Sequence, residues 1–425
     1  MSVLETESLF LTVVVQLLII VAAARAGGWL FIRLGQPRVV GEIAAGLLLG
    51  PSVLGALAPE LSGQLFPDAA RSSIHTLGQL GLVLLMFLVG LEFDFGHLRR
   101  LGRAATAVSL AGIALPFGAG LAVARLIHPH VAPGVPPVTF MLFVAVALSI
   151  TAIPILGRII VDLGLERTRL AALTMSAAAV DDVLGWILLA AVTAAAQGSF
   201  EPASTLRTLV LVIALALAVW FVARPLVVAW SRRVLAAGAG HLEAGPLAIL
   251  LMAILGAAAL SSWIGIFALF GPFLLGAALW DQEELRLAIR ARLWDFVHAF
   301  FLPVFFTSTG LHTDFGFLDS ALLWGLSALV CLAAVGGKMI GCGVAARLGG
   351  MSPRESWGVA VMMNTRALMG LVAIHVGREM GVVTDAAFSM LVLMALLTTF
   401  MTTPLLRLIL GDEIGPARGR SGGER

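Results

Sequence analysis

The chain has 425 residues, of which 60% are hydrophobic and only 12% are charged, with a formal net charge of +2. A soluble domain carries about 25% charged residues, so this composition excludes an ordinary soluble protein and indicates a membrane protein. The small net charge does not favour nucleic-acid binding. Cys331 and Cys342 are expected to be buried apolar residues, not a disulfide or a metal site. The acidic N-terminus lacks the basic start of a signal peptide, so the first apolar segment is expected to be retained.

Apolar segments of about 20 residues, long enough to cross a bilayer, recur along the whole chain. The expected fold class is therefore an all-α polytopic membrane protein. The sequence predicts thirteen transmembrane helices, at about 7–33, 39–57, 74–92, 104–126, 137–160, 168–196, 205–231, 245–262, 264–280, 293–311, 319–346, 354–378 and 382–409.

Arginines are distributed unevenly among the loops that join these segments. With the N-terminus outside, twenty arginines fall on the cytoplasmic side and four on the opposite side, as the positive-inside rule requires. The C-terminus and the short tail 411–425 are then cytoplasmic. Thirteen helices also divide into two halves of six joined by a linking helix at about 205–231. Seven crossings separate equivalent helices, so the halves are inverted repeats, as in many secondary transporters.

Two adjacent acids, Asp181 and Asp182, lie in the middle of the sixth predicted helix. Ionisable residues at mid-membrane are costly, so each is a functional candidate. Neighbouring helical positions point about 100° apart, so one acid can face an ion pathway while the other meets a neighbouring helix. A carboxylate there can hold a proton or a hard cation, and competition between the two is the basis of an exchanger. Alternatively, the pair merely anchors helices, although one polar residue would do so at lower cost.

Lys338, in the eleventh predicted helix, is the only lysine among 27 basic residues. A buried lysine can lose its proton, whereas an arginine cannot. Lys338 is therefore a candidate for a switchable partner of one aspartate. A permanent structural ion pair is the alternative, and only titration separates the two.

The fifth predicted helix contains Ser149, Thr151 and Pro154. Pro154 removes a backbone donor and clashes with the carbonyl of Ile150. The sequence therefore predicts a loosened turn with exposed carbonyls beside the two hydroxyls. Carbonyl, hydroxyl and carboxylate oxygens are suitable ligands for Na⁺, K⁺ or Li⁺.

The twelfth predicted helix contains a second polar group, Asn364, Thr365 and Arg366, followed by Gly370. Arg366 cannot carry protons, and a structural role is expected for it, offsetting the acids or capping a half-helix. The histidines are too scattered for a metal site, and no phosphate-binding glycine loop occurs. We therefore expect no cofactor, no ATP-driven step and no enzymatic activity.

Several longer motifs accompany these residues in a specific order. They comprise Leu-Gly-Gln-Pro-Arg-Val-Val-Gly-Glu-Ile from Leu34, and the segments 81–92, 147–154, 302–311 and 398–406, with Asp181-Asp182, Gly337-Lys338 and Asn364-Thr365-Arg366 between them. From about residue 7 to 410, the chain resembles the cation/proton antiporter-2 family. Bacterial sodium/proton antiporters and plant cation/proton exchangers are the most similar branches.

The resemblance implies a homodimer in the bacterial inner membrane, with a dimer panel and a mobile core that carries the ion by an elevator-like movement. The expected ranges are about 7–92 and 245–311 for the panel, and about 104–196 and 319–409 for the core. Two crossing, partly unwound helices, the fifth and the twelfth, would lie in the core.

The resemblance also implies individual roles. Asp182 would carry the cation and the proton with Thr151 as a nearby ligand, and Asp181 would pair with Lys338. Relatives often have an acid where this chain has Gly370, and potassium-efflux members append a nucleotide-binding domain that is not expected here.

The resulting interpretation is a secondary antiporter that exchanges Na⁺ or K⁺ for protons. Three alternatives stay open: a cation channel or uniporter, a membrane sensor that has lost transport, and a proton-coupled exporter of an organic cation.

Overall fold

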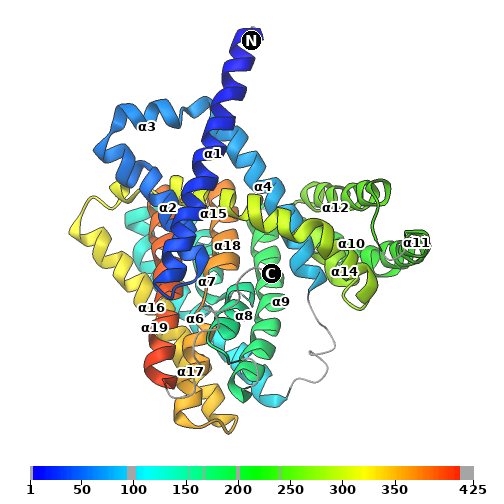
Figure 1. Ribbon diagram of the computed structural model, residues 1–425. Coiled ribbons are helices and arrows are strands. Elements are labelled where there is room, and N and C mark those ends of the chain that lie inside the picture. Colours follow the sequence, from blue (N-terminus) through cyan, green and yellow to red (C-terminus); the bar gives the residue numbers. More distant parts are fainter. Residues whose placement is uncertain are drawn as a thin grey trace. The chain divides into compact units, whose positions relative to one another are not determined.

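The structure, a computed structural model, describes residues 3–92, 102–151, 153–165, 168–197, 202–238 and 241–411, and within these ranges it contains helices but no strand (Figure 1). The helices are α1 (Val3–Arg33), α2 (Arg38–Leu49), α3 (Pro59–Leu65), α4 (Asp68–Leu91), α6 (Arg103–Val131), α7 (Pro137–Ser149), α8 (Ile153–Asp162), α9 (Arg169–Gln197), α10 (Pro202–Ala218), α11 (Arg224–Ala237), α12 (Ala244–Ile264), α13 (Phe270–Ala278), α14 (Glu283–Phe296), α15 (Leu302–Leu311), α16 (Ala321–Leu348), α17 (Pro353–Met363), α18 (Ala367–Glu379) and α19 (Asp385–Leu410). Short π-helical turns lie at Pro51–Gly55, Val219–Ala223 and Val297–Phe301, and a 3-10 turn lies at Phe315–Phe317.

Nine helices in the described ranges are long and apolar enough to cross a membrane, which agrees with the predicted class. They are Glu7–Arg33, Arg38–Gly55, Ser72–Leu91, Arg103–Val131, Arg169–Ala196, Leu206–Ala236, Ala244–Ile264, Ala321–Leu348 and Asp385–Leu410. The other four predicted segments, 137–160, 264–280, 293–311 and 354–378, are built from shorter or interrupted helices. The count of thirteen crossings and the inverted repeat therefore stay predictions.

The chain forms two compact units. Unit 1 comprises Met1–Ala24, Pro59–Gly96 and Ala190–Ser308, and unit 2 comprises Arg25–Ala58, His97–Leu189 and Thr309–Arg425. Every residue singled out as a candidate for ion binding belongs to unit 2. The segment containing α2, expected in the dimer panel, also belongs to unit 2, whereas the predicted linking helix belongs to unit 1. The roles of panel and core stay predictions.

Unit 1 contains a sharp turn between α12 and α13, near one end of the predicted segment 264–280. Gly265, which follows α12, has a φ of 91°, a conformation that favours glycine. The Ser261 hydroxyl donates to the Ala257 carbonyl at 2.9 Å and accepts from the Gly271 amide at 3.2 Å. One buried serine thus satisfies backbone groups on both sides of the turn.

In unit 2, α6 and α16 approach each other at backbone distance. A Cβ added at Gly341 would lie 2.5 Å from the Ala111 carbonyl oxygen, and one added at Gly112 would lie 2.5 Å from the Cys342 sulfur. Small residues permit such close contact between membrane helices. The contact places Lys338 against α6, because a Cβ at Gly112 would also lie 3.7 Å from its ammonium nitrogen.

Both interruptions expected in the polar segments of unit 2 are present. After α7, Ile150 is extended with a ψ of 140°, and α8 begins at Ile153, so the expected loosened turn is a complete break. Pro154 is the second residue of α8, where a missing amide donor costs no helical hydrogen bond; its side chain lies outside the described residues. The second break separates α17 from α18 and consists of residues 364–366.

Candidate functional site

The two helix breaks are joined by a hydrogen bond. The Thr151 hydroxyl, after α7, donates to the carbonyl of Met363, the last residue of α17, at 3.0 Å. Both residues are buried, as non-helical backbone at membrane depth must be. A helix C-terminus carries partial negative charge. The ends of α7 and α17 therefore create a local field that favours cations.

Asp181, on α9, is held by donors from separate elements. The Lys338 ammonium lies 2.6 Å from Asp181 Oδ2 and also donates to the Ser149 carbonyl, at the end of α7, at 2.5 Å. The Thr151 hydroxyl oxygen also lies 2.5 Å from the same carboxylate oxygen, so its single proton is shared between Asp181 and the Met363 carbonyl. Neither Asp181 nor Lys338 has any exposed side-chain surface. The structure thus brings together the Asp181 and Lys338 that the resemblance paired.

A third donor to Asp181, Ser109 on α6, was missed by the sequence analysis. Its hydroxyl donates to Asp181 Oδ1 at 3.3 Å and is fully buried. The only signal in the sequence was a small hydroxyl in a mainly apolar predicted helix, which also contains Thr106 and Arg125. Such a residue carries no large cost of burial and does not stand out, unlike an acid or a lysine.

Asp182, the next residue along α9, has a different environment. It is 1% exposed, and neither of its carboxylate oxygens has a hydrogen-bond partner among the described residues. Because one residue rotates about 100° around a helix, Asp182 does not share the donors of Asp181. Burying an ionised carboxylate without a partner costs several kcal/mol. The arrangement therefore provides one acid with fixed partners beside another that requires a proton or a cation.

The hydroxyls of Thr151 and Ser149 were expected to be ligands of an ion at Asp182, but the structure places them against other groups. Thr151 contacts Asp181 and the Met363 carbonyl. The Ser149 hydroxyl donates to the Val146 carbonyl of its own helix at 2.9 Å, and it is the Ser149 backbone oxygen that meets Lys338. Direct coordination of an ion by either hydroxyl stays a prediction.

Arg366 holds the second break against α16. Its guanidinium donates to the Ala334 carbonyl at 2.8 Å and to the Asn364 side-chain oxygen at 3.1 Å, and it is fully buried. The Thr365 hydroxyl lies 3.5 Å from that of Thr402 on α19. No acid occurs among the hydrogen-bond partners of Arg366 in the described part of the chain. These contacts suit the structural role expected for the group.

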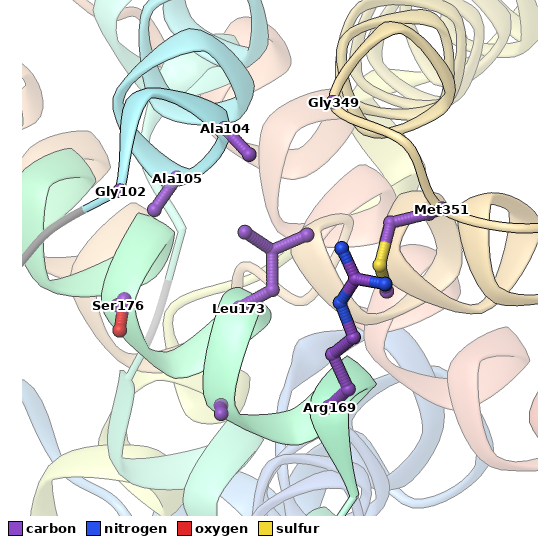
Figure 2. A pocket seen from close by; sticks show the side chains of 9 residues that line it. Gly102, Ala104, Ala105, Arg169, Leu173, Ser176, Gly349 and Met351 are labelled. Carbon is purple, nitrogen blue, oxygen red and sulfur yellow. The ribbon is translucent and has the colours of Figure 1, made fainter.

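Unit 2 also contains a cavity of about 290 Å³ near the starts of α6 and α9 and the end of α16 (Figure 2). It is lined by Gly102, Ala104, Ala105, Arg169, Ala172, Leu173, Ser176, Gly349 and Met351. Figure 2 shows the Arg169 and Leu173 side chains extending from α9 toward this space. Ala105 lies one helical turn before Ser109. The same helix, α6, therefore contributes to the cavity wall and carries the hydroxyl that donates to Asp181.

Comparison with known proteins places this arrangement in a family. Residues 18–410 match the family described as sodium/hydrogen exchanger, transmembrane. The Na⁺/H⁺ antiporter NhaS4 of Synechocystis sp. is 36% identical over 412 residues, which cover 95% of this chain and 98% of that protein. Cation/H⁺ antiporter 17 of Arabidopsis thaliana is 36% identical over 397 residues, which cover 92% of this chain but 47% of the longer plant protein.

The fold has a counterpart among solved structures. The sodium proton antiporter MjNhaP1 from Methanocaldococcus jannaschii matches with a TM-score of 0.61, covering 95% of this chain and 98% of that one. At 15% identity, this likeness concerns the fold alone. The family match extends over nearly the whole chain and includes both helix breaks and the acid pair. The chain therefore belongs to the sodium/hydrogen exchanger family of transmembrane proteins.

Proposed function

We propose that this protein is a secondary antiporter that exchanges a monovalent cation, Na⁺ or K⁺, for protons. The observation that carries the proposal is the Asp182 carboxylate, buried and without a described hydrogen-bond partner. Relatives named as antiporters support it and cover both ions. NhaS4 is named for Na⁺ and H⁺, whereas a 30% identical protein of Saccharomyces cerevisiae is named K⁺/H⁺ antiporter 1.

The charges at the site explain why exchange would be coupled. Lys338 compensates Asp181, so the state of Asp182 determines the remaining charge. A bound proton and a bound monovalent cation leave the same net charge, and either can replace the other. An empty, ionised Asp182 would be a buried uncompensated charge, which is strongly unfavourable. Conformational change is thus favoured when Asp182 holds either a proton or a cation, and it is disfavoured when Asp182 is empty.

Access to the site would alternate between the two sides of the membrane. In this proposal the cavity beside Arg169 and Ala105 is a vestibule on the cytoplasmic side, which the arginine-rich loops favour. The mobile core, expected at about 104–196 and 319–409, would move in an elevator-like way against the panel of a homodimer, expected at about 7–92 and 245–311. Exchange of this kind would contribute to pH homeostasis at the bacterial inner membrane.

A cation channel or uniporter is the nearest alternative. It would pass the cation with no proton moving in return, and an obligatory choice of ligand at Asp182 argues against it. A sensor that has lost transport would have no need of two costly buried acids. An exporter of an organic cation would use the same acid, and only the choice of substrate separates it from the proposal.

The test is cation-induced proton movement in proteoliposomes. Purified protein is reconstituted with a pH-sensitive dye inside, a proton gradient is imposed, and Na⁺, K⁺ or Li⁺ is added over a range of pH. Antiport predicts that at least one ion dissipates the gradient, and that liposomes containing Asp182→Asn protein do not respond. Cation flux that persists without a proton gradient and follows membrane voltage alone would favour a channel. No response to any inorganic cation, with a response to an organic one, would favour the exporter.

A further inference from the structure

We infer that Ser109 is a positioning residue for transport: it holds Asp181 in the orientation that keeps Lys338 engaged and leaves Asp182 open to the cation. This inference rests on the proposed exchange and adds a residue from α6 to a site otherwise formed by the helix breaks, α9 and α16.

The two oxygens of Asp181 have unequal support. Oδ2 accepts from Lys338 at 2.6 Å and from Thr151 at 2.5 Å, whereas Oδ1 accepts only from Ser109, at 3.3 Å, among the described residues. All four side chains are buried. Ser109 is therefore the described donor to the second oxygen, and together with the two donors on Oδ2 it sets the orientation of the carboxylate.

The position of Ser109 is itself fixed by the packing of α6 on α16. The Cys342 thiol of α16 donates to the carbonyl of Val108, the neighbour of Ser109, at 3.7 Å. Gly112, nearly one turn later, faces Cys342 so closely that a Cβ there would lie 2.5 Å from the sulfur, while the Lys338 ammonium lies at contact distance, 3.7 Å. The turn that carries Ser109 is thus packed directly against the helix that carries Lys338. The Ser109 hydroxyl and the Lys338 ammonium thus reach Asp181 from two helices that are in close contact.

Removal of the hydroxyl would leave Asp181 Oδ1 buried without a donor among the described residues, and the carboxylate would be held through Oδ2 alone. Its hold on the Lys338 ammonium would weaken. Because Asp182 is adjacent and has no described partner, the loosened ammonium would compete with the transported cation for that acid. The expected effect is a weaker apparent cation affinity. A hydrogen bond to a charged group is worth roughly tenfold or more in an equilibrium constant, and the 3.3 Å length places this contact at about three- to tenfold.

The experiment measures KM for the cation and the maximal rate in proteoliposomes for Ser109→Ala, with Ser109→Thr as the variant that retains a hydroxyl. Ser327→Ala is the matched control, because Ser327 is also a buried serine in unit 2 but its hydroxyl donates only to Leu323 of its own helix, at 2.8 Å. Ser109→Cys, nearly isosteric and a weaker donor, takes the place of the alanine variant should that protein not fold.

The inference predicts a three- to tenfold higher KM for Ser109→Ala with the maximal rate within about twofold of wild type. Ser109→Thr should recover most of the affinity, and Ser327→Ala should leave KM unchanged. An unchanged KM in Ser109→Ala, or an equal rise in the control, overturns the role of Ser109 while wild-type exchange still stands. A wild-type protein that exchanges no cation overturns this inference together with the proposed function.

Discussion

The Lys338 ammonium lies 2.6 Å from Asp181, with both side chains fully buried, while Asp182, one residue further along α9, has no hydrogen-bond partner among the described residues. The fold thus places two identical side chains, those of Asp181 and Asp182, in different environments. The charge of Asp181 is compensated by Lys338. Asp182 still requires a proton or a cation to offset the cost of its burial. This asymmetry assigns different consequences to substitutions at neighbouring positions.

Asp182→Asn should abolish exchange, because the amide can neither bind a proton in exchange for a cation nor compensate its charge. Asp182→Glu retains the carboxylate on a longer side chain and should keep partial activity. Both are measured as cation-induced proton movement in proteoliposomes, after confirming equal reconstitution. Normal exchange by the asparagine variant would remove Asp182 from the proposed site.

Lys338→Gln and Lys338→Met should alter the charge moved per cycle or shift the pH profile of exchange, while the protein remains folded. A neutral side chain at this position leaves the buried Asp181 carboxylate without the ammonium that compensates its charge. Currents recorded from proteoliposomes adsorbed on a solid-supported membrane provide the measurement. Currents and pH profile identical to wild type would assign Lys338 a purely structural ion pair.

The thermal stability of the protein should test the Asp181–Lys338 ion pair independently of transport. Lys338→Met leaves the Asp181 charge buried without its cationic partner, at a cost of about 3–5 kcal/mol, whereas replacing both members of a buried pair is often nearly neutral. Lys338→Met should therefore lower the melting temperature in detergent, and Asp181→Asn with Lys338→Met should restore much of it. If the double variant loses as much stability as Asp181→Asn and Lys338→Met lose when added together, the two residues are not coupled.

Two glycines in unit 2 should respond to alanine in opposite directions. A Cβ at Gly370 would meet only the Arg366 Cβ, at 3.5 Å, so Gly370→Ala should stabilise α18 by up to about 1 kcal/mol through helix propensity. A Cβ at Gly112 would lie 2.5 Å from the Cys342 sulfur. Gly112→Ala should therefore destabilise the protein by about 1–3 kcal/mol through overpacking against Cys342 and slow exchange by disturbing the contact between α6 and α16.

Thermal melting of the two alanine variants tests this contrast directly. Adding Cys342→Ala to Gly112→Ala frees the space that the new methyl group needs, so part of the stability and of the exchange should return. A Gly112→Ala protein as stable and as active as wild type would show that the α6–α16 contact tolerates separation.

Ser176, in the cavity wall, should be reachable from the cytoplasmic side. Both native cysteines are buried, so a Ser176→Cys protein can be labelled with a membrane-impermeant thiol reagent without removing them. Labelling should occur in inside-out vesicles, and a bulky label should slow exchange. Ile187→Cys is the matched control, because Ile187 lies on the same helix but is 54% exposed on a surface expected to face lipid. Labelling of Ser176→Cys only in right-side-out vesicles would reverse the proposed orientation.

The amino-acid sequence by itself determined the class of protein and the positions of the ionisable residues that are costly to bury in a membrane. Long apolar segments require a bilayer, and an acid or a lysine within one is conspicuous because its burial is expensive. Asp181, Asp182 and Lys338 stood out for that reason, and the polar segments around Thr151 and Arg366 indicated both helix breaks. The partner of Lys338, by contrast, came from resemblance to a family and not from any pattern in the chain.

Only the tertiary structure decided which groups meet. Lys338 and Ser109 reach Asp181 from positions 157 and 72 residues away, and no local periodicity encodes such contacts. Thr151 turned out to support Asp181, although the resemblance associated it with Asp182. Ser109 could not be predicted because a serine is inexpensive to bury, and its contact with Asp181 arises from the packing of helices that are distant in the sequence. The sequence located the charges, and the packing of helices determined which acid is paired with Lys338 and which has no hydrogen-bond partner among the described residues.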